Sequence, residues 1–229
     1  MSVSAGARIT SVLGVASALM VLVLVGLALS TGVSQEYFEG EHPVVEYAQK
    51  LVAAAPALRV GFTFDNLFIL AYSCFFVVLA SILRKSADPY PVNLALAAMI
   101  GVALLDAVEN HHIMAMADAA VQGSSPTAEE IRAQTVISSV KFHLSCIGAL
   151  LFAMTFPRET TIGRWVVGLL VGYAVFGILV LTAPPQLLDL LALIRTAFFV
   201  LSFLVVARMM WSFRGPEGAI EVSATRYGH

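Results

Sequence analysis

Residues 92–116 read VNLALAAMIGVALLDAVENHHIMAM, an apolar stretch that is long enough to cross a bilayer and yet carries five polar side chains in its second half. These side chains are Asp106, Glu109, Asn110, His111 and His112. A charge near the middle of a spanning helix costs about 2.5–3.5 kcal/mol on insertion scales, so such residues usually serve a function. The sequence therefore predicts that other polar groups meet this helix inside the protein.

The composition of the whole chain is that of a polytopic membrane protein. Of its 229 residues, 59% are hydrophobic and 12% are charged, and the mean hydropathy is +0.87. Soluble domains are about 25% charged. The net charge of −2 and the absence of Gly-rich phosphate loops and zinc-ribbon cysteines give no indication of a nucleic-acid or nucleotide partner. We therefore expect the lipid bilayer, and no nucleic acid, among its partners.

Six apolar stretches predict an all-α integral membrane protein, folded as a single bundle of six transmembrane helices. The predicted spans are about 9–31, 61–83, 92–116, 135–156, 162–181 and 186–211. The apolar core of the first span is longer than that of a signal peptide, so we expect this span to be uncleaved. Residues 1–214 then form the transmembrane domain, and residues 215–229 form a polar cytoplasmic tail.

Residues 33–60, between the first and second spans, are polar and rich in glutamate. One helical face of this segment is apolar, formed by Val44, Ala48, Leu51, Val52 and Ala55. The pattern predicts a short, outward-facing amphipathic helix on the membrane surface.

Basic residues predict the orientation. One side of the predicted membrane carries Arg8, Arg84, Lys85, Arg158, Arg164, Arg208 and Arg214, and the other carries Lys50, Arg59 and Arg132. The richer side is expected to be cytoplasmic. We therefore expect a protein of the cell (plasma or inner) membrane with both termini in the cytoplasm and the glutamate-rich first loop outside.

Polar residues on four spans are predicted to converge at one depth. Asp106, Glu109 and Asn110 follow an i, i+3, i+4 spacing and share one helical face. At about 1.5 Å per residue, the ionisable groups lie about 7–15 Å from the outer interface. The candidate cluster is Asp65, Asn66, Tyr72, Asp106, Glu109, Asn110, Ser138, Lys141, Ser145 and Arg195. The fifth span has no charge in its core and is expected to stand outside this site.

The balance of charge and the residue types leave several kinds of chemistry open. Asp65, Asp106 and Glu109 against Lys141 and Arg195 leave one negative charge, which a proton, a metal ion or a cationic ligand group would balance. The metal hypothesis, with a zinc-like ion, uses the carboxylate and imidazoles of Glu109, His112 and His143. The nucleophile hypothesis uses Ser138, Ser139 or Ser145 beside Lys141 or His143.

Three functions are compatible with these residues. The first is an outward-facing polar pocket that binds, and in one version transforms, a small molecule or lipid headgroup. The second is a proton- or ion-coupled transporter that uses Asp106 and Glu109, against which the Leu-, Val- and Phe-rich inner half argues. The third is a structural subunit in which the buried charges only fix helix packing. Gly168 and Gly172 also predict a close helix contact, either within the bundle or in a homo-oligomer.

Overall fold

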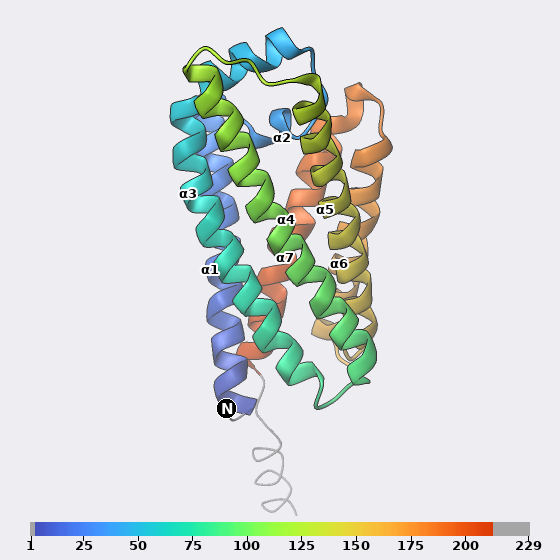
Figure 1. Cartoon of the computed structure of the whole chain (residues 1–229). Coiled ribbons are helices and arrows are strands. Elements are labelled where there is room, and N and C mark those ends of the chain that lie inside the picture. Colours follow the sequence, from blue (N-terminus) through green and yellow to red (C-terminus); the bar gives the residue numbers. More distant parts are fainter. Residues whose placement is uncertain (1–2, 213–229) are drawn as a thin grey trace, which may run out of the picture.

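Seven helices account for most of residues 3–212, the part of the chain that this computed structural model describes (Figure 1). They are α1 (Val3–Thr31), α2 (Gln35–Phe38), α3 (Val44–Leu83), α4 (Pro89–Val121), α5 (Ala128–Thr155), α6 (Thr161–Thr182) and α7 (Pro185–Trp211). All of them except the four-residue α2 are long and apolar enough to cross a bilayer. The predicted all-α bundle of six spans is therefore confirmed. The predicted tail, 215–229, lies outside the described residues.

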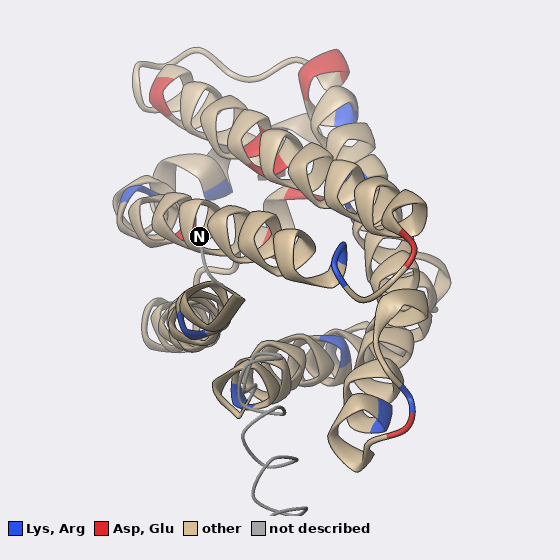
Figure 2. Cartoon of the chain, turned by 90° about the horizontal axis from the view of Figure 1, so that it is seen from below, with Lys and Arg blue, Asp and Glu red and all other residues tan. Residues whose placement is uncertain are grey.

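The six long helices stand in a ring that follows the order of the chain. Each helix packs on the next, and α7 closes the ring by packing on α1, whereas contacts across the ring are few. Figure 2 views this ring from the end at which the N-terminus lies. We call the opposite end of the bundle the distal end. Every long helix consequently offers side chains to the interior.

Side-chain caps mark the starts of α4 and α5. Asp88 accepts a hydrogen bond from the N–H of Tyr90 at 2.9 Å, and Pro89 occupies the first turn of α4, where its missing N–H has no cost. Thr127 and Glu130 form a reciprocal capping box at the start of α5. These caps satisfy backbone N–H groups that the first turn of a helix leaves without partners.

The separate amphipathic helix that the sequence predicts does not form. Residues 44–60 instead continue without a break into the second span, so α3 has 40 residues and is about 60 Å long. The face that is buried packs on the distal end of α4 and on Phe38, and it includes Leu51 and Ala55 of the predicted apolar face, whereas Val52 is 46% exposed. We call this group the distal cluster, whose largest members are Phe38, Tyr47, Leu51, Leu58, Phe62, Ile113, Met116 and Ile131. Burial against α4 therefore explains why this face is apolar.

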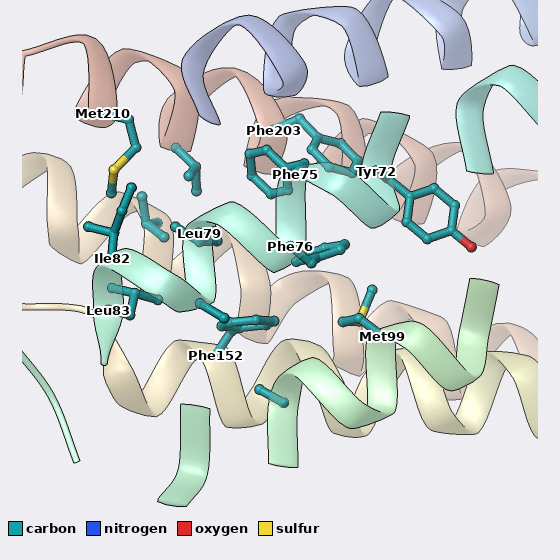
Figure 3. Close-up of a cluster of buried hydrophobic side chains, with 14 of the residues drawn as sticks. Tyr72, Phe75, Phe76, Leu79, Ile82, Leu83, Met99, Phe152, Phe203 and Met210 are labelled. Atoms are coloured by element: carbon teal, nitrogen blue, oxygen red, sulfur yellow. The ribbon is translucent and has the colours of Figure 1, made fainter. Parts of the chain in front are cut away.

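Aromatic side chains fill the interior in the half of the ring nearer the N-terminus (Figure 3). Phe76 stacks on Phe152 with their ring centroids 5.3 Å apart, and Phe75 meets Phe203 edge-on at 5.1 Å. We call these four residues the aromatic floor. A cavity of only about 30 Å³ remains among them and their neighbours. The floor therefore leaves little free space in this half of the bundle.

Gly168 and Gly172, two of the four glycines of α6, differ in their surroundings. A Cβ atom added to Gly172 would overlap the ring of Phe198 on α7, whereas one added to Gly168 would have no neighbour within 4 Å. Gly172 therefore serves packing within the chain, and only Gly168 offers open space to a second copy. A homo-oligomer through this face remains a prediction.

We expect Gly172→Val to lower the free energy of unfolding by about 1–3 kcal/mol, because α6 and α7 must move apart. Gly168→Val, on the same helix, is the matched control and is expected to unfold at the wild-type temperature. Thermal unfolding in detergent, followed by circular dichroism, measures both. Equal melting temperatures for the two variants would contradict this account of the α6–α7 contact.

Candidate ligand-binding site

Lys141 on α5 lies among three carboxylates from two other parts of the chain. Its Nζ is 3.2 Å from Glu39 Oε1 and 3.2 Å from Asp106 Oδ1, and it also forms an ion pair with Glu109. The side chain of Lys141 is 7% exposed and that of Glu109 is 0% exposed. We call these four residues the Lys141 cluster. One buried cation therefore serves three acids.

Glu109 is the most enclosed member of the cluster, and its hydrogen-bond partners are all donors. Ser138 donates to its carboxylate, and Gln134 Nε2 donates to Oε1 at 2.8 Å. Gln134 Oε1 in turn lies 2.9 Å from His112 Nδ1. A buried carboxylate is tolerated only when its oxygens are satisfied in this way. Glu109 therefore has a structural place in the contact between α4 and α5.

Asp106 lies one turn before Glu109 on α4 and faces the interior of the ring. The hydroxyl of Tyr72 donates to Asp106 Oδ2 at 2.6 Å, and Lys141 contacts the other oxygen. Figure 3 shows the hydroxyl of Tyr72 pointing away from the aromatic floor. Asp106 and Tyr72 thus mark the level at which the interior changes from apolar to polar.

Asp65 is held by an amide and has no cationic partner. Asn110 Nδ2 donates to Asp65 Oδ2 at 2.6 Å and to Asn66 Oδ1 at 3.3 Å. Gln35 Nε2 donates to the oxygen of Asn110 at 3.3 Å. Among the residues described, no ion pair involves Asp65. This carboxylate therefore adds negative charge that no base within residues 3–212 neutralises in an ion pair.

Arg195 on α7 does not join the Lys141 cluster. Its guanidinium donates to Glu36 Oε1 at 2.8 Å, and its Cζ lies 4.5 Å from the ring centre of Phe142. Lys141 Nζ lies 4.8 Å from the centre of the same ring. Both bases were expected in one cluster with the acids of the spans. Arg195 instead has a partner in the first loop, because that loop folds back into the ring.

A chamber of about 220 Å³ lies between these residues and is lined by α2 and by every long helix. Its distal part is polar and includes Glu36, Glu39, Asp65, Asp106, Lys141 and Arg195. Its other part is apolar and includes Phe68, Met99, Val102 and Phe199. Met99 and Phe199 also border the small cavity among the aromatic floor. The chamber is therefore charged at one end and hydrocarbon-like at the other, inside a membrane-spanning bundle.

The loop between α1 and α3 covers the chamber, and we call residues 32–43 the strap. Phe38 fixes the strap in the distal cluster with 2% of its surface exposed, and its carbonyl accepts a hydrogen bond from Tyr47 at 2.9 Å. Tyr37 donates to Glu46 at 3.0 Å. Burial, this hydrogen bond and the charge of Glu46 raise the pKa of Tyr37 to about 12, so its phenol stays protonated near neutral pH.

The sequence analysis missed the residues of the strap and one residue of α6. Gln35, Glu36 and Glu39 line the chamber, although a loop has no periodicity that could have placed them. Tyr173 also lines it, and the hydroxyls of Tyr173 and Ser145 are hydrogen-bonded at 2.9 Å. The expectation that the fifth span stands outside the site is therefore wrong. A tyrosine in an otherwise apolar span was the available signal.

The residues of the metal hypothesis do not gather. His143 is exposed, and its Nδ1 lies 2.7 Å from the carbonyl of Ser139, while His112 contacts Gln134. Two residues along a helix turn the side chain by about 200°, so His143 points away from Lys141. Within residues 3–212 no group of three His, Cys, Asp or Glu could hold a metal ion.

The two buried serines of the nucleophile hypothesis are engaged in other contacts. The single hydroxyl proton of Ser138 lies within reach of Glu109 and of the carbonyl of Gln134, and Ser145 donates to the carbonyl of Phe142. Lys141, surrounded by carboxylates, is held as a cation and has no lone pair with which to accept a proton.

Comparisons of this chain with protein-family models, with curated proteins and with solved structures give no match.

Proposed function

We propose that this protein binds a small amphipathic molecule or a lipid headgroup in the chamber. The single observation that supports this function is a cavity of about 220 Å³ with buried charges at one end and an apolar lining at the other. Ligand sites in proteins have this mixture of an apolar lining and a few convergent polar groups. Charged groups are rarely kept at membrane depth without such a use.

The distal end is proposed to face the outside of the cell membrane. The opposite end carries Arg84 and Lys85 after α3, and Arg158 and Arg164 near the turn between α5 and α6. It also carries the exposed aromatic residues Tyr90, Trp165 and Trp211. Basic residues gather on the cytoplasmic side, and Trp and Tyr lie at membrane interfaces. The strap and the chamber would then open to the outside, with the N-terminus in the cytoplasm.

A proton- or ion-coupled transporter is a weaker proposal on the same residues. Asp106 and Glu109 are at the right depth for a relay, but a polar path would have to continue toward the N-terminal end. Side chains of the aromatic floor occupy that space. A purely structural role suits Glu109, which is fully buried and satisfied, but not Asp106 and Asp65, which line the chamber.

Neighbouring residues on α7 provide a test of the chamber. Thr196 lines it, whereas Ala197 is exposed on the outside of the ring. We expect Thr196→Trp to fill the chamber and to reduce bound ligand by at least about tenfold, which corresponds to about 1.4 kcal/mol of binding free energy. Ala197→Trp adds the same side chain outside the chamber and is expected to retain the ligand.

The measurement is native mass spectrometry of the three proteins in mild detergent after incubation with a total lipid extract. Bound mass in the wild type and in Ala197→Trp, together with its loss in Thr196→Trp, would support the proposal. Equal bound mass in all three proteins, or none in the wild type, would count against it.

A further inference from the structure

The chamber contains more acids than bases. Its charged residues and their direct partners are Glu36, Glu39, Asp65, Asp106 and Glu109 against Lys141 and Arg195. Among the described residues this is a formal excess of three negative charges. An unbalanced charge in a medium of low dielectric constant is costly, so a cation or bound protons must reduce the excess.

The two resident bases are already neutralised, so the chamber has no free positive charge to offer an anion. Lys141 contacts three carboxylates, and Arg195 donates to Glu36. A phosphate or carboxylate group would therefore add to the excess, and a neutral group would leave it unchanged. Of these three kinds of ligand group, only a cationic group lowers the excess.

Carboxylate oxygens are also available to a donor. Asn110 contacts Oδ2 of Asp65, and no hydrogen bond within residues 3–212 reaches Oδ1. Lys141 likewise contacts Oε1 of Glu39, and Oε2 has no hydrogen bond among the described residues. Both side chains line the chamber. An ammonium group has three N–H donors and no acceptor, which suits a site built from acceptors.

The chamber adjoins a second cavity that opens toward the surrounding lipid. A second cavity, of about 550 Å³, lies between the distal ends of α1, α3 and α7 and shares Leu24, Gln35, Glu36 and Thr196 with the chamber. Its wall includes Leu29, which is 81% exposed, and Leu193, which is 65% exposed. Exposed leucines at this position lie against acyl chains in a spanning bundle. A hydrocarbon chain can therefore extend from the chamber into the membrane.

From this combination of charge and shape we propose that the ligand is a membrane-dissolved amine, with its ammonium group among Asp65, Glu39 and Asp106 and its hydrocarbon chain in the apolar part of the chamber or the lateral opening. This inference rests on the proposed function and adds the chemical class of the ligand.

The test uses three probes of equal chain length: dodecylamine, dodecanol and dodecanoate. The full-length protein is placed in nanodiscs of zwitterionic lipid, and the affinity for each probe is measured from the rise in melting temperature that the probe causes. Nanodiscs that contain the Thr196→Trp variant, whose chamber is filled, serve as the reference. We expect dodecylamine to bind at least about tenfold more tightly than dodecanol, and dodecanoate to bind least. Zwitterionic lipid keeps the membrane itself from selecting among the charges.

Asp65→Asn keeps the size of the side chain and removes its charge. We expect it to lower the affinity for dodecylamine by at least about fivefold and to leave the affinity for dodecanol within about twofold of the wild type. Asp118→Asn is the matched control, since Asp118 pairs with Arg59 at the surface and does not line the chamber. It is expected to bind both probes as the wild type does.

The outcomes separate the two proposals. If dodecanol or dodecanoate binds as well as dodecylamine, and Thr196→Trp abolishes that binding, the proposal of an amine ligand is wrong and the proposal of a binding chamber stands. An equal loss of affinity for dodecanol and dodecylamine in Asp65→Asn also overturns the proposal of an amine ligand. If no probe distinguishes the wild type from Thr196→Trp, both proposals fail.

Discussion

Replacing Lys141 with methionine is expected to lower the free energy of unfolding by about 3–5 kcal/mol, a large part of the stability of most proteins. Methionine has a similar length, so the change removes charge rather than volume. It leaves Glu39, Asp106 and Glu109 facing one another without a cation. The three carboxylates, which all contact the same Nζ, would repel one another. Water cannot reach Glu109 to reduce this repulsion, because its side chain is 0% exposed.

The opposite change, Glu109→Gln, is expected to cost only about 0–1.5 kcal/mol. Lys141 keeps two carboxylate partners, Glu39 and Asp106. Glutamine at position 109 can still accept the hydrogen bonds from Ser138 and Gln134. The two members of one ion pair therefore have unequal costs, because the acids outnumber the base.

Chemical unfolding in detergent, followed by circular dichroism, measures both costs. Lys85→Met is the matched control, since Lys85 is exposed at the other end of the bundle, and it is expected to be neutral within about 0.5 kcal/mol. The double variant Lys141→Met with Glu109→Gln should be more stable than Lys141→Met alone. Equal costs for Lys141→Met and Glu109→Gln would contradict the description of one cation serving three acids.

Much of this arrangement could be predicted from helical periodicity and hydropathy. Long apolar runs gave six spans, and the i, i+3, i+4 spacing placed Asp106, Glu109 and Asn110 on one face of α4. The structure brings these residues toward Lys141 on α5 and Asp65 on α3. A charge inside an apolar run has so few acceptable positions that its direction follows from the cost of exposing it to lipid.

The strap could not be predicted in this way. Glu36 and Glu39 lie in a loop, where no period relates sequence to direction, and a glutamate there is ordinarily solvated. They reach the chamber because Phe38, between them, is buried in the distal cluster. For this reason, the excess of acids over bases in the chamber is larger than the sequence suggested.

The extent of α3 depended on its neighbour rather than on its own sequence. An amphipathic segment before a span is compatible with a helix on the membrane surface or with an extension of the span beyond the bilayer. The buried face of residues 44–60 packs on the distal end of α4, which also extends past its predicted span. Pro56 does not end the helix, since α3 runs through it.

Phe38→Ala is expected to release the strap. Phe38 is 2% exposed and packs against Tyr47 with ring centroids 5.6 Å apart. We expect its loss to cost about 3–5 kcal/mol of local stability, because a large cavity opens where the strap meets α3. The cost falls on the strap, which contributes one short helix, while the ring of long helices keeps its own contacts.

Hydrogen–deuterium exchange gives the readout, with faster exchange expected at the amides of residues 33–43 and little change in α5 and α6. Val45→Ala is the matched control, since Val45 is 68% exposed in the same region. Because the strap carries Glu36 and Glu39 into the chamber, its release should also lower the affinity for dodecylamine more than the affinity for dodecanol. Unchanged exchange in the strap would mean that its ion pairs with Lys141 and Arg195, rather than Phe38, hold it in place. Faster exchange throughout the bundle would instead mean that the strap is part of the same cooperative unit as the six spans, and that the chamber cannot open without unfolding.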